Sequence, residues 1–561
     1  MVSFRATTVA VFGILHVVVA AVPGHSLILN KNVNTSASDF KRGSFQDGSV
    51  YCKKRDCKFV SGTLDWHGAT AVGAFNDTLL STGWGILDIS SGFGPSQTNE
   101  EIMYAAGFME GVLTFRQMES QFTNLFSVFF PKPDKSMQQK LEKWFTTQRA
   151  WADQMASNYP DDPLWRHSSY IFAQLDGLYA GYKSVRGADK TALDFFAINF
   201  LNANGDLFDI MTVLQPSESP DWTTFTADEA ANFFYTNGHC SALIKILPGY
   251  ENIFMSHSSW FAYQATNRIY KHYNFNVDDP STAAKRVSFS SYGGYLESLD
   301  DFYQMDSGLV MLQTTNNIFN KTLHKYVTPQ ALLAWQRVRI ANMMAHGGKE
   351  WAQVIAKYNS GSYNNQYMVL DLKLITPKKP LPDNTLWVAE QIPGLVVAED
   401  TTPILRAGYF PSYNIPFFEE IFVKSGYPEY VKKHGIQYTY DLAPRASIFR
   451  RDQGKVKDME SMKAIMRYND YKNDPYSYGS PWGAICSRGD LVKGMTMPDG
   501  CYDTKVADLA MAKAFQADII NGPTLGNDFP PFSWTGKYAN YSHAGLPLTY
   551  DFSFVRTQPR F

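Results

Sequence analysis

The chain changes from helical to strand-like patterning at Cys240, and this change constrains its fold more than any other feature. Long amphipathic helical patterns occupy residues 98–214, over 100–129, 135–159 and 191–214. Beyond Cys240, short apolar runs typical of strands predominate. Helices and strands in separate blocks, without regular alternation, favour an α+β fold over a Rossmann fold or a barrel.

The residues that join these two parts are typical of a linker. Residues 215–221 are rich in proline, serine and acidic side chains, and a weakly patterned stretch continues to His239. Residues 241–247 and 253–257 then form two apolar runs separated by a Pro-Gly turn, so we predict a β-hairpin that begins directly after Cys240. Further strands are expected over 286–292, 308–315, 366–375 and 386–391, and a helix over 329–358.

The amino end has the pattern of a signal peptide. Arg5 precedes an apolar stretch from Thr8 to Val19, and small residues follow before Pro23. The stretch is shorter than the roughly 20 residues that span a bilayer, and no later stretch qualifies. We therefore divide the chain into a signal peptide (1–22), a helix-rich N-terminal part (23–215), a linker or processing segment (216–239) and a C-terminal part (240–561).

Four Asn-x-Ser/Thr triplets add to the evidence for export. They predict glycosylation at Asn34, Asn76, Asn320 and Asn540, and with the signal peptide they indicate a glycoprotein of the secretory pathway. We expect it in the lysosome or outside the cell. With 51 basic and 53 acidic residues, the chain has no excess positive charge to attract nucleic acid.

Common catalytic signatures are missing from the sequence. It has no G-x-S-x-G elbow, no phosphate-binding G-x-x-x-x-G-K-[ST] loop and no H-E-x-x-H zinc motif. A serine esterase of the common fold is therefore disfavoured, and we expect no metal and no cofactor.

The five cysteines of the chain cannot all pair within it. Cys52 and Cys57 flank a short polar segment, and Cys486 and Cys501 flank a loop with glycine and proline, so we predict these two disulfides. Cys240 is left over. On this evidence alone it is either an inert buried thiol, a bridge to another chain, or a reactive group.

The position of Cys240 gives it a specific chemistry. A thiol that follows a linker and begins a core strand can attack the carbonyl of the preceding residue, His239, and water can then hydrolyse the resulting thioester. The cut creates a new amino terminus on Cys240. Because an α-amino group has a pKa of about 7.7–8, it can take the proton from the thiol of its own residue.

Long sequence strings around Cys240 resemble a known family. Gly-His-Cys-Ser-Ala-Leu-Ile-Lys at 238–245 and His-Ser-Ser-Trp at 257–260 are similar to the nucleophile region of phospholipase B-like proteins, which are N-terminal-nucleophile hydrolases. Similar strings occur at 289–292, 299–303, 359–371, 411–414, 441–446, 449–454 and 501–508. The resemblance implies a four-layer αββα sandwich and self-cleavage between His239 and Cys240 into two chains that stay associated.

The resemblance also implies roles for individual residues. Cys240 matches the family nucleophile, and His257 and Trp260 match residues that line its pocket, although a structural histidine at a strand end is the alternative for His257. Asn414 is a candidate for holding the oxyanion, since a side-chain amide donates to developing negative charge.

Four charged residues complete the candidate set. Asp300 and Asp301 would orient the new ammonium group beside the substrate pocket, or would simply cap a turn. For Arg445 and Arg450 we expect structural ion pairs rather than contact with substrate.

Three functions follow from these observations. The first is an acyl hydrolase that removes fatty acyl chains from phospholipids through a thioester on Cys240. The second keeps this chemistry on a small amide or peptide, because N-terminal-nucleophile enzymes are most often amidases. The third is a processed glycoprotein without turnover. In each case the partner of the C-terminal chain is its own N-terminal fragment.

Overall fold

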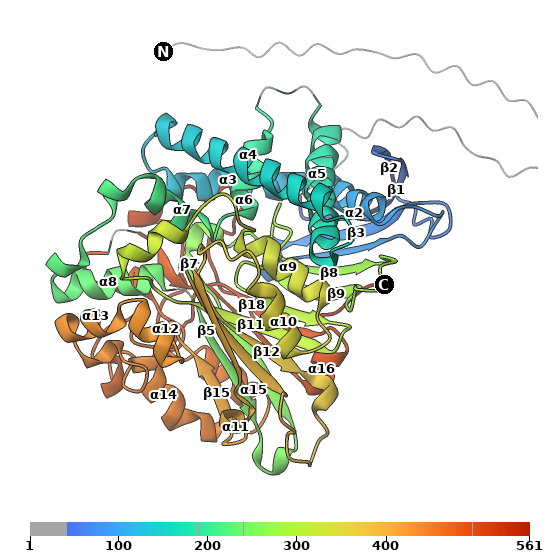
Figure 1. The fold of residues 1–561 in the computed structure, drawn as a ribbon. Helices are drawn as coiled ribbons and strands as arrows, with labels where there is room; N and C mark the ends of the chain where they lie inside the picture. Colours follow the sequence, from blue (N-terminus) through green and yellow to red (C-terminus); the bar gives the residue numbers. More distant parts are fainter. Residues whose placement is uncertain (1–41, 188, 190, 239, 496) are drawn as a thin grey trace, which may run out of the picture. The chain divides into compact units, whose positions relative to one another are not determined.

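The computed structural model describes residues 42–187, 189, 191–238, 240–495 and 497–561 (Figure 1). The expected signal peptide, the triplet at Asn34 and His239 of the expected cleavage site lie outside these residues. Within the described ranges, no helix combines the length and the apolar character needed to cross a bilayer.

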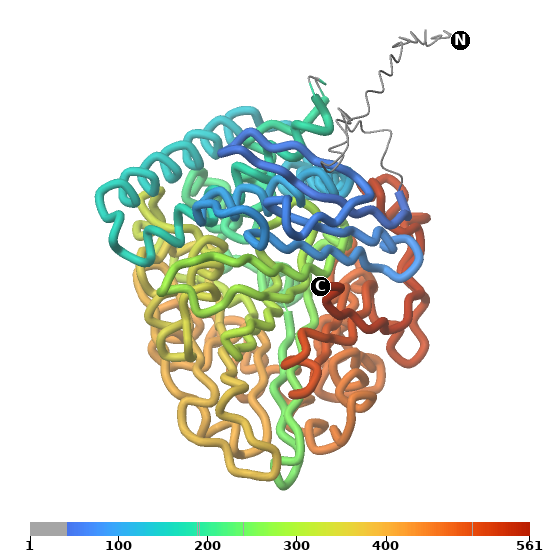
Figure 2. Tube along the Cα trace, turned by 90° about the vertical axis from the view of Figure 1, so that its right-hand side faces the viewer, coloured from blue at the N-terminus to red at the C-terminus, as the bar shows by residue number. Residues whose placement is uncertain are grey.

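The larger sheet combines strands from both sides of Cys240. Among the described residues it has eleven strands, in the order β14-β13-β12-β11-β10-β9-β8-β4-β3-β1-β2. They are β1 (Phe45–Lys53), β2 (Asp56–Ser61), β3 (Ala71–Thr78), β4 (Trp84–Ser91), β8 (Arg268–Phe275), β9 (Arg286–Tyr292), β10 (Phe302–Met305), β11 (Leu309–Thr315), β12 (Asn365–Asp371), β13 (Leu386–Ile392) and β14 (Leu395–Asp400). Neighbouring strands are antiparallel except β4 and β8, which pair in parallel. Figure 2 shows the blue N-terminal strands beside the yellow-green strands of the C-terminal part.

A second sheet carries the expected hairpin. Its strands follow the order β15-β5-β6-β17-β18-β19. They are β15 (Tyr409–Ser412), β5 (Ser241–Ile246), β6 (Ile253–Ser258), β17 (Asp503–Asp508), β18 (Ala517–Asn521) and β19 (Val555–Thr557), and a separate pair joins β7 (Trp260–Ala262) to β16 (Asp499–Cys501). β5 and β6 pair antiparallel, which confirms the predicted hairpin, and Cys240 immediately precedes β5.

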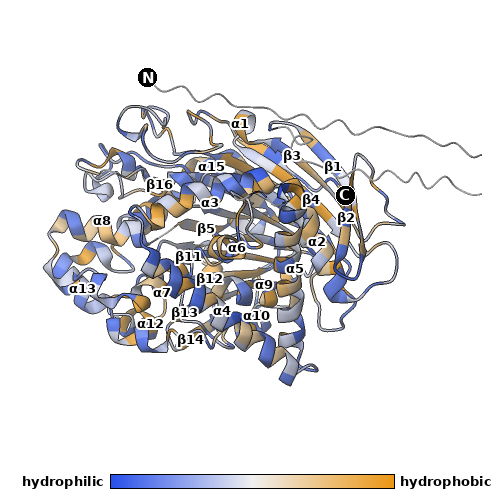
Figure 3. Cartoon of the chain, turned by 90° about the horizontal axis from the view of Figure 1, so that it is seen from above, coloured by the Kyte–Doolittle hydropathy of each residue, from blue (hydrophilic) through white to orange (hydrophobic). Residues whose placement is uncertain are grey.

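An apolar core lies between the two sheets. Because strand side chains alternate between faces, Ala242 and Ile244 of β5 share this core with Val310 and Leu312 of β11. Leu243, between the first two, belongs instead to a core on the other side of the smaller sheet. In Figure 3, strands β3 and β4 also show extended apolar colouring.

Helices cover the other face of the larger sheet. They include α2 (Asn99–Leu113), α3 (Phe115–Phe129), α4 (Lys135–Asn158), α5 (Pro163–Arg186), α6 (Phe195–Asn202), α7 (Leu207–Leu214), α9 (Ala334–Met344) and α10 (Gly348–Ile355). α2 and α5 pack closely through glycines: a Cβ on Gly107 would lie 1.9 Å from the carbonyl oxygen of Gln174, and one on Gly177 would lie 2.0 Å from that of Tyr104.

A third core joins helices to the smaller sheet. The helices are α8 (Ala227–Asn237), α13 (Tyr427–His434), α14 (Pro444–Asp452) and α15 (Met459–Met466). The remaining helices are short: α1 (Leu79–Thr82), α11 (Thr402–Leu405), α12 (Glu419–Lys424) and α16 (Leu509–Lys513).

Helix α8 is a feature that the sequence did not predict, because it lies in the weakly patterned part of the expected linker. Thr226 and Glu229 form a capping box at its start. Near its end, the buried Phe234 packs against the rings of Tyr430 and Tyr438. These contacts from distant sequence stabilise a helix whose own pattern is weak. The helix ends at Asn237, and its C-cap, Gly238, lies two residues before Cys240.

The other sequence predictions of structure agree in outline. The helical patterns of 98–214 form helices α2 to α7, and large sheets beside separate helices confirm the α+β class. The expected helix over 329–358 divides at Ala345, whose backbone is extended, into α9 and α10. Strands β1 to β4 were not predicted. Both disulfides are confirmed, Cys52–Cys57 across the β1–β2 hairpin and Cys486–Cys501.

Candidate active site

Cys240 lies where helix α8 gives way to strand β5, and its thiol is the one among the five cysteines that forms no disulfide. Its side chain is buried. Its φ angle is +90°, a conformation that a residue with a side chain rarely adopts. Burial raises the pKa of the thiol, against the effects of a backbone hydrogen bond from Trp260 and of the nearby Lys505 charge. In this structure the thiol is therefore held neutral.

Arg445 holds the main chain of Cys240. Its Nη1 donates to the carbonyl oxygen of Cys240 at 2.6 Å, and its guanidinium carbon lies 4.3 Å from the centre of the Trp260 ring. The expected ion pair is wrong for Arg445 and for Arg450, because among the described residues neither contacts a carboxylate. Arg450 donates instead to the carbonyl oxygen of Asp441. Each guanidinium group thus donates to a main-chain carbonyl oxygen instead of a carboxylate.

Asn414 lies beside the chain that leads into Cys240. It is buried, its φ angle is +68°, and its Nδ2 donates to the carbonyl oxygen of Thr315 at 2.6 Å. A Cβ built on Gly238 would lie 3.1 Å from the Cβ of Asn414 and 3.3 Å from the Nδ2 of Asn317. Two side-chain amides therefore flank the segment that contains the expected cleavage site. Sequence reasoning missed Asn317.

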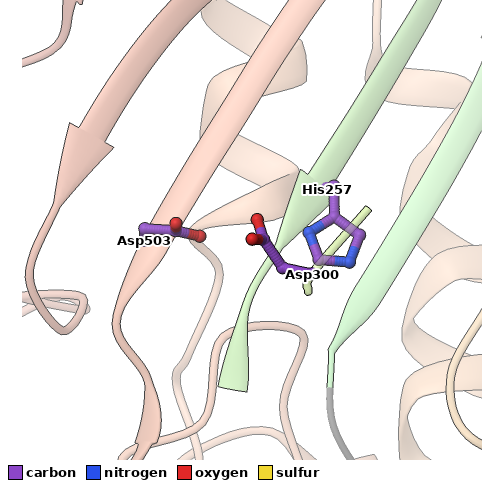
Figure 4. Close-up of side chains that lie close together, drawn as sticks. All are labelled: His257, Asp300 and Asp503. Carbon is purple, nitrogen blue, oxygen red and sulfur yellow. The ribbon is translucent and has the colours of Figure 1, made fainter. Parts of the chain in front are cut away.

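His257 belongs to a buried charge network centred on Lys505. The Lys505 ammonium group donates to Nδ1 of His257 at 3.0 Å, to Oδ2 of Asp300 at 2.6 Å and to Oδ1 of Asp503 at 2.8 Å. The Oγ of Ser259 lies 2.6 Å from the same nitrogen, so the three N–H donors of Lys505 are shared among four acceptors. Figure 4 shows His257, Asp300 and Asp503 close together. These three residues could serve as metal ligands, but the lysine ammonium group hydrogen-bonds to all of them.

The network fixes the protonation state of His257. Its Nδ1 accepts from Lys505, so its Nε2 is the donor to the carbonyl oxygen of Gln313 at 2.9 Å. Burial, reinforced by the Lys505 charge, lowers its pKa well below the ordinary range. Both ring nitrogens are engaged, and His257 does not line the cavity of Cys240. It is therefore a structural member of the network and has no free nitrogen to act as a base.

The pKa values of the neighbouring carboxyls Asp300 and Asp301 are shifted in opposite directions. Burial raises the pKa of Asp300, but the Arg268 and Lys505 charges outweigh it and hold the pKa below the ordinary range. Asp301, with a φ angle of +48°, has a pKa raised well above its ordinary value by burial and by the Asp300 charge. Of these two neighbouring carboxyls, Asp300 is therefore the one that carries negative charge. The sequence did not indicate that Lys505 and Arg268 would be its partners.

Two cavities adjoin this site. A small one, of about 20 Å³, contains Cys240 and is lined by Trp260 and Asp300, as expected, together with Asn204. A larger one, of about 280 Å³, lies next to it, and Phe208 and Tyr363 line both. Residues of the segment 216–238 also line the larger cavity: Ser219, Pro220, Trp222, Phe233 and Asn237. This segment thus forms one wall of the larger cavity.

Asp209 of α7 gives the larger cavity a titratable group. It lines the cavity, and its Oδ2 accepts from the backbone N–H of Tyr363 at 2.8 Å. Burial raises its pKa from an ordinary 3.8 to about 7, and the charge of Asp206 adds to the shift. Between these two pH values the folded carboxyl is protonated while the unfolded one is ionised. Folding therefore takes up a proton, and the contribution of Asp209 to stability is lost as the pH rises toward 7.

We expect Asp209→Asn to reduce the loss of stability between pH 4.5 and pH 7. The amide keeps the acceptor for Tyr363 and has no proton to lose, so it removes a slope of up to about 1.4 kcal/mol per pH unit. Urea unfolding at both pH values measures this slope. The exposed Asp161→Asn is the control for the change of net charge, and an equal effect of both substitutions would contradict the assignment.

Comparison with known proteins identifies the family. A family model described as Phospholipase B matches residues 71–557. This chain belongs to the phospholipase B family. Relatives of this family member include Phospholipase B-like 1 from Bos taurus, 52% identical over 89% of this chain and 90% of the relative. Phospholipase B from Crotalus adamanteus is 50% identical over 92% and 94% of the two chains, and Phospholipase B-like protein G from Dictyostelium discoideum is 36% identical over 87% and 86%.

Proposed function

We propose that this phospholipase B family member is an acyl hydrolase that cuts its own chain before Cys240 and then uses Cys240 as the nucleophile on phospholipid esters. The single observation that carries the proposal is the position of Cys240: a buried, unpaired thiol at the first residue before a core strand, next to a cavity. Membership of the family and the names of its relatives support a lipid substrate.

The architecture supports the same proposal. Three apolar cores separate helices, the larger sheet, the smaller sheet and further helices. We interpret this order as a four-layer αββα sandwich of the N-terminal-nucleophile type. In such a fold, a nucleophile at the start of an inner strand is held rigidly by the sheet.

Self-cleavage begins with attack of the Cys240 Sγ on the carbonyl carbon of His239. The bond between that carbon and the Cys240 nitrogen breaks, the nitrogen takes the thiol proton, and a thioester joins His239 to Sγ. Water then hydrolyses the thioester, which leaves a carboxylate on His239 and a free α-amino group on Cys240. Asn414 and Asn317 lie beside Gly238, and one N–H of each amide donates to a main-chain carbonyl, of Thr315 and of Phe234. In this proposal the second N–H of either amide donates to the oxyanion.

The new amino group would allow the buried Cys240 thiol to ionise. Burial disfavours a lone thiolate, as the raised pKa shows. An α-amino group on the same residue can accept the thiol proton, and the resulting ammonium is a positive partner for the thiolate. The thiolate then attacks the ester carbonyl, the ammonium protonates the departing alcohol, and water releases the fatty acid.

Cleavage also alters access to the site. The segment 216–238 contributes Trp222, Phe233 and Asn237 to the wall of the larger cavity. Once its carboxyl end is free of Cys240, this segment is able to move away. We propose that its displacement widens the larger cavity and gives substrate a route to the thiol.

The lining of the larger cavity favours a second candidate, an amidase. Side-chain amides of Asn237, Asn316, Asn317 and Asn364 line it, together with charged Lys321. Such groups match a polar amide substrate better than a long fatty acyl chain. The chemistry on Cys240 would be the same.

We further propose export through the secretory pathway to the lysosome or the cell exterior. Asn76 and Asn540 are exposed, as glycosylation requires, whereas the Nδ2 of Asn320 already donates to the carbonyl oxygen of Lys424. Glycans are therefore expected at Asn76 and Asn540 before Asn320.

The test combines processing with turnover. Protein incubated at acidic pH should yield two fragments that stay associated, and the larger should begin Cys-Ser-Ala-Leu-Ile. The matured protein is then assayed on phospholipids and N-acyl amides with the same acyl chain. Preference for phospholipid supports the first proposal, and preference for amide supports the second. Matured protein that reacts with no thiol-directed acylating probe would favour a glycoprotein without turnover.

A further inference from the structure

The side-chain amide of Asn204 is buried without a hydrogen bond to any described residue. It lies in the turn between α6 and α7, is fully buried, and lines the small cavity of Cys240. Neither its Oδ1 nor its Nδ2 has a hydrogen-bond partner among the residues that the structure describes. A buried polar group without partners costs stability, so its presence beside a thiol needs an explanation.

Asn202, two residues earlier, is a buried asparagine whose side chain does form hydrogen bonds, and it serves as a comparison for Asn204. It is equally buried. Its Nδ2 donates to the carbonyl oxygens of Ile198 and Gly294, each at 2.9 Å, and its Oδ1 accepts from the backbone N–H of Leu296 at 2.7 Å. Asn202 thus uses both of its N–H donors and its carbonyl oxygen, whereas Asn204 uses neither group.

The turn holds Asn204 in a fixed place. The next residue, Gly205, packs so closely on Tyr363 that a Cβ there would lie 2.6 Å from the ring. Asp206 then accepts from the backbone N–H of Ala334 at 3.0 Å and from the hydroxyl of Ser362. These contacts of the next two residues hold the backbone that carries Asn204 beside the cavity.

We propose that Asn204 is a catalytic residue of the mature site, contributed by the N-terminal chain, whose amide binds the substrate at the carbonyl that Cys240 attacks. This inference rests on the proposed function. The Nδ2 donates to the acyl carbonyl oxygen, and the Oδ1 accepts from a polar hydrogen beside it. The matching substrate class is an acyl compound that carries an N–H or O–H close to the scissile carbonyl.

The amides found beside Gly238 differ from the amide that lines the small cavity. The chain that enters Cys240 passes Asn414 and Asn317 at Gly238, and neither of these residues lines the small cavity. Asn204 lines that cavity and is not among the nearest neighbours of Gly238. We therefore expect Asn204 to act on substrate during turnover and not on the His239 carbonyl during processing.

The test is Asn204→Leu, with Asn202→Leu as the matched control. We expect the Asn204 variant to mature into the same two fragments, with kcat/KM lower by about 10- to 1000-fold on the better of a phospholipid and an N-acyl amide. Its Tm should equal or exceed that of the unchanged protein, because leucine removes unpaired polar atoms. Asn202→Leu should lower the Tm, because it breaks three hydrogen bonds.

Other results would overturn the inference. One is an Asn204→Leu protein with kcat/KM within twofold of the unchanged protein; another is a fall in its Tm that matches that of Asn202→Leu. If leucine is too large for the turn and the variant does not fold, Asn204→Ala is measured in the same way. If the unchanged, correctly matured protein hydrolyses no acyl substrate, the proposed function fails first and Asn204 has no substrate to bind.

Discussion

Replacing Cys240 with alanine should leave the chain intact between residues 239 and 240 and abolish acyl hydrolysis. Alanine has no nucleophile for the His239 carbonyl, and without the cut no α-amino group forms to act as base. The substitution removes one sulfur atom beside an existing cavity, so we expect the precursor to fold. Gel electrophoresis after acidic incubation, with an activity assay on the same sample, measures both effects.

Cys240→Ser is the informative companion to the alanine variant. A hydroxyl can attack the same carbonyl but is far less acidic than a thiol, whose ordinary pKa is about 8.5, so cutting should be slow or partial. Any fragment released should begin with the substituted serine and hydrolyse acyl substrates much more weakly. If Cys240→Ala matured at the same bond, another protease would be the cutter. An uncut and fully active Cys240→Ala protein would contradict the entire mechanism.

Replacing Lys505 with methionine should lower the free energy of unfolding by about 3–5 kcal/mol. The ammonium group of Lys505 is fully buried and bonds to Asp300, Asp503, His257 and Ser259. Methionine fills a similar volume but leaves two buried carboxylates with Arg268 as their remaining cation. The loss of stability comes from this uncompensated charge, and urea unfolding measures it.

The control for this prediction is Lys424→Met. Lys424 pairs with Glu420 on the surface, where both side chains are about half exposed, so its loss should cost less than about 1 kcal/mol. Similar effects of the two substitutions would show that the Lys505 network contributes no more than a surface pair. The assignment of His257 as a structural group would then fall as well, because it depends on Lys505.

The sequence predicted those parts of the molecule that local pattern determines. The hairpin after Cys240 follows from two apolar runs around a turn, and the disulfides follow from cysteine spacing. Helix α8 escaped prediction because its stability depends on aromatic residues of α13 and its neighbours. Strands β1 to β4 were also missed. Of these, only β4 pairs with a distant strand, β8; the other pairings join near neighbours in the chain.

The candidate site was predicted only where a residue lies close to Cys240 in sequence or matches a family string. Trp260 and Asp300 do line the cavity of the thiol. Lys505 lies in the family-like string 501–508 but was not assigned a role, because sequence does not show which carboxylates surround a buried lysine. Asn204 was missed because no spacing rule relates a turn after α6 to a cysteine at the start of β5. Arg445 was named but assigned an ion pair, since sequence does not show that a backbone carbonyl occupies its guanidinium group.

The parallel pairing of β4 with β8 has a consequence for the life of the matured molecule. Residues 85–91 align with residues 269–275 across this seam, and the proposed cut lies between them in the chain. In the uncut chain, the linking residues keep the two strands at a high effective concentration, so their pairing is intramolecular. After the cut the strands would belong to separate chains, and their pairing after unfolding would depend on protein concentration. Unfolding of the cut protein would thus become practically irreversible. Its lifetime would then depend on the rate of unfolding and not on the free energy of unfolding.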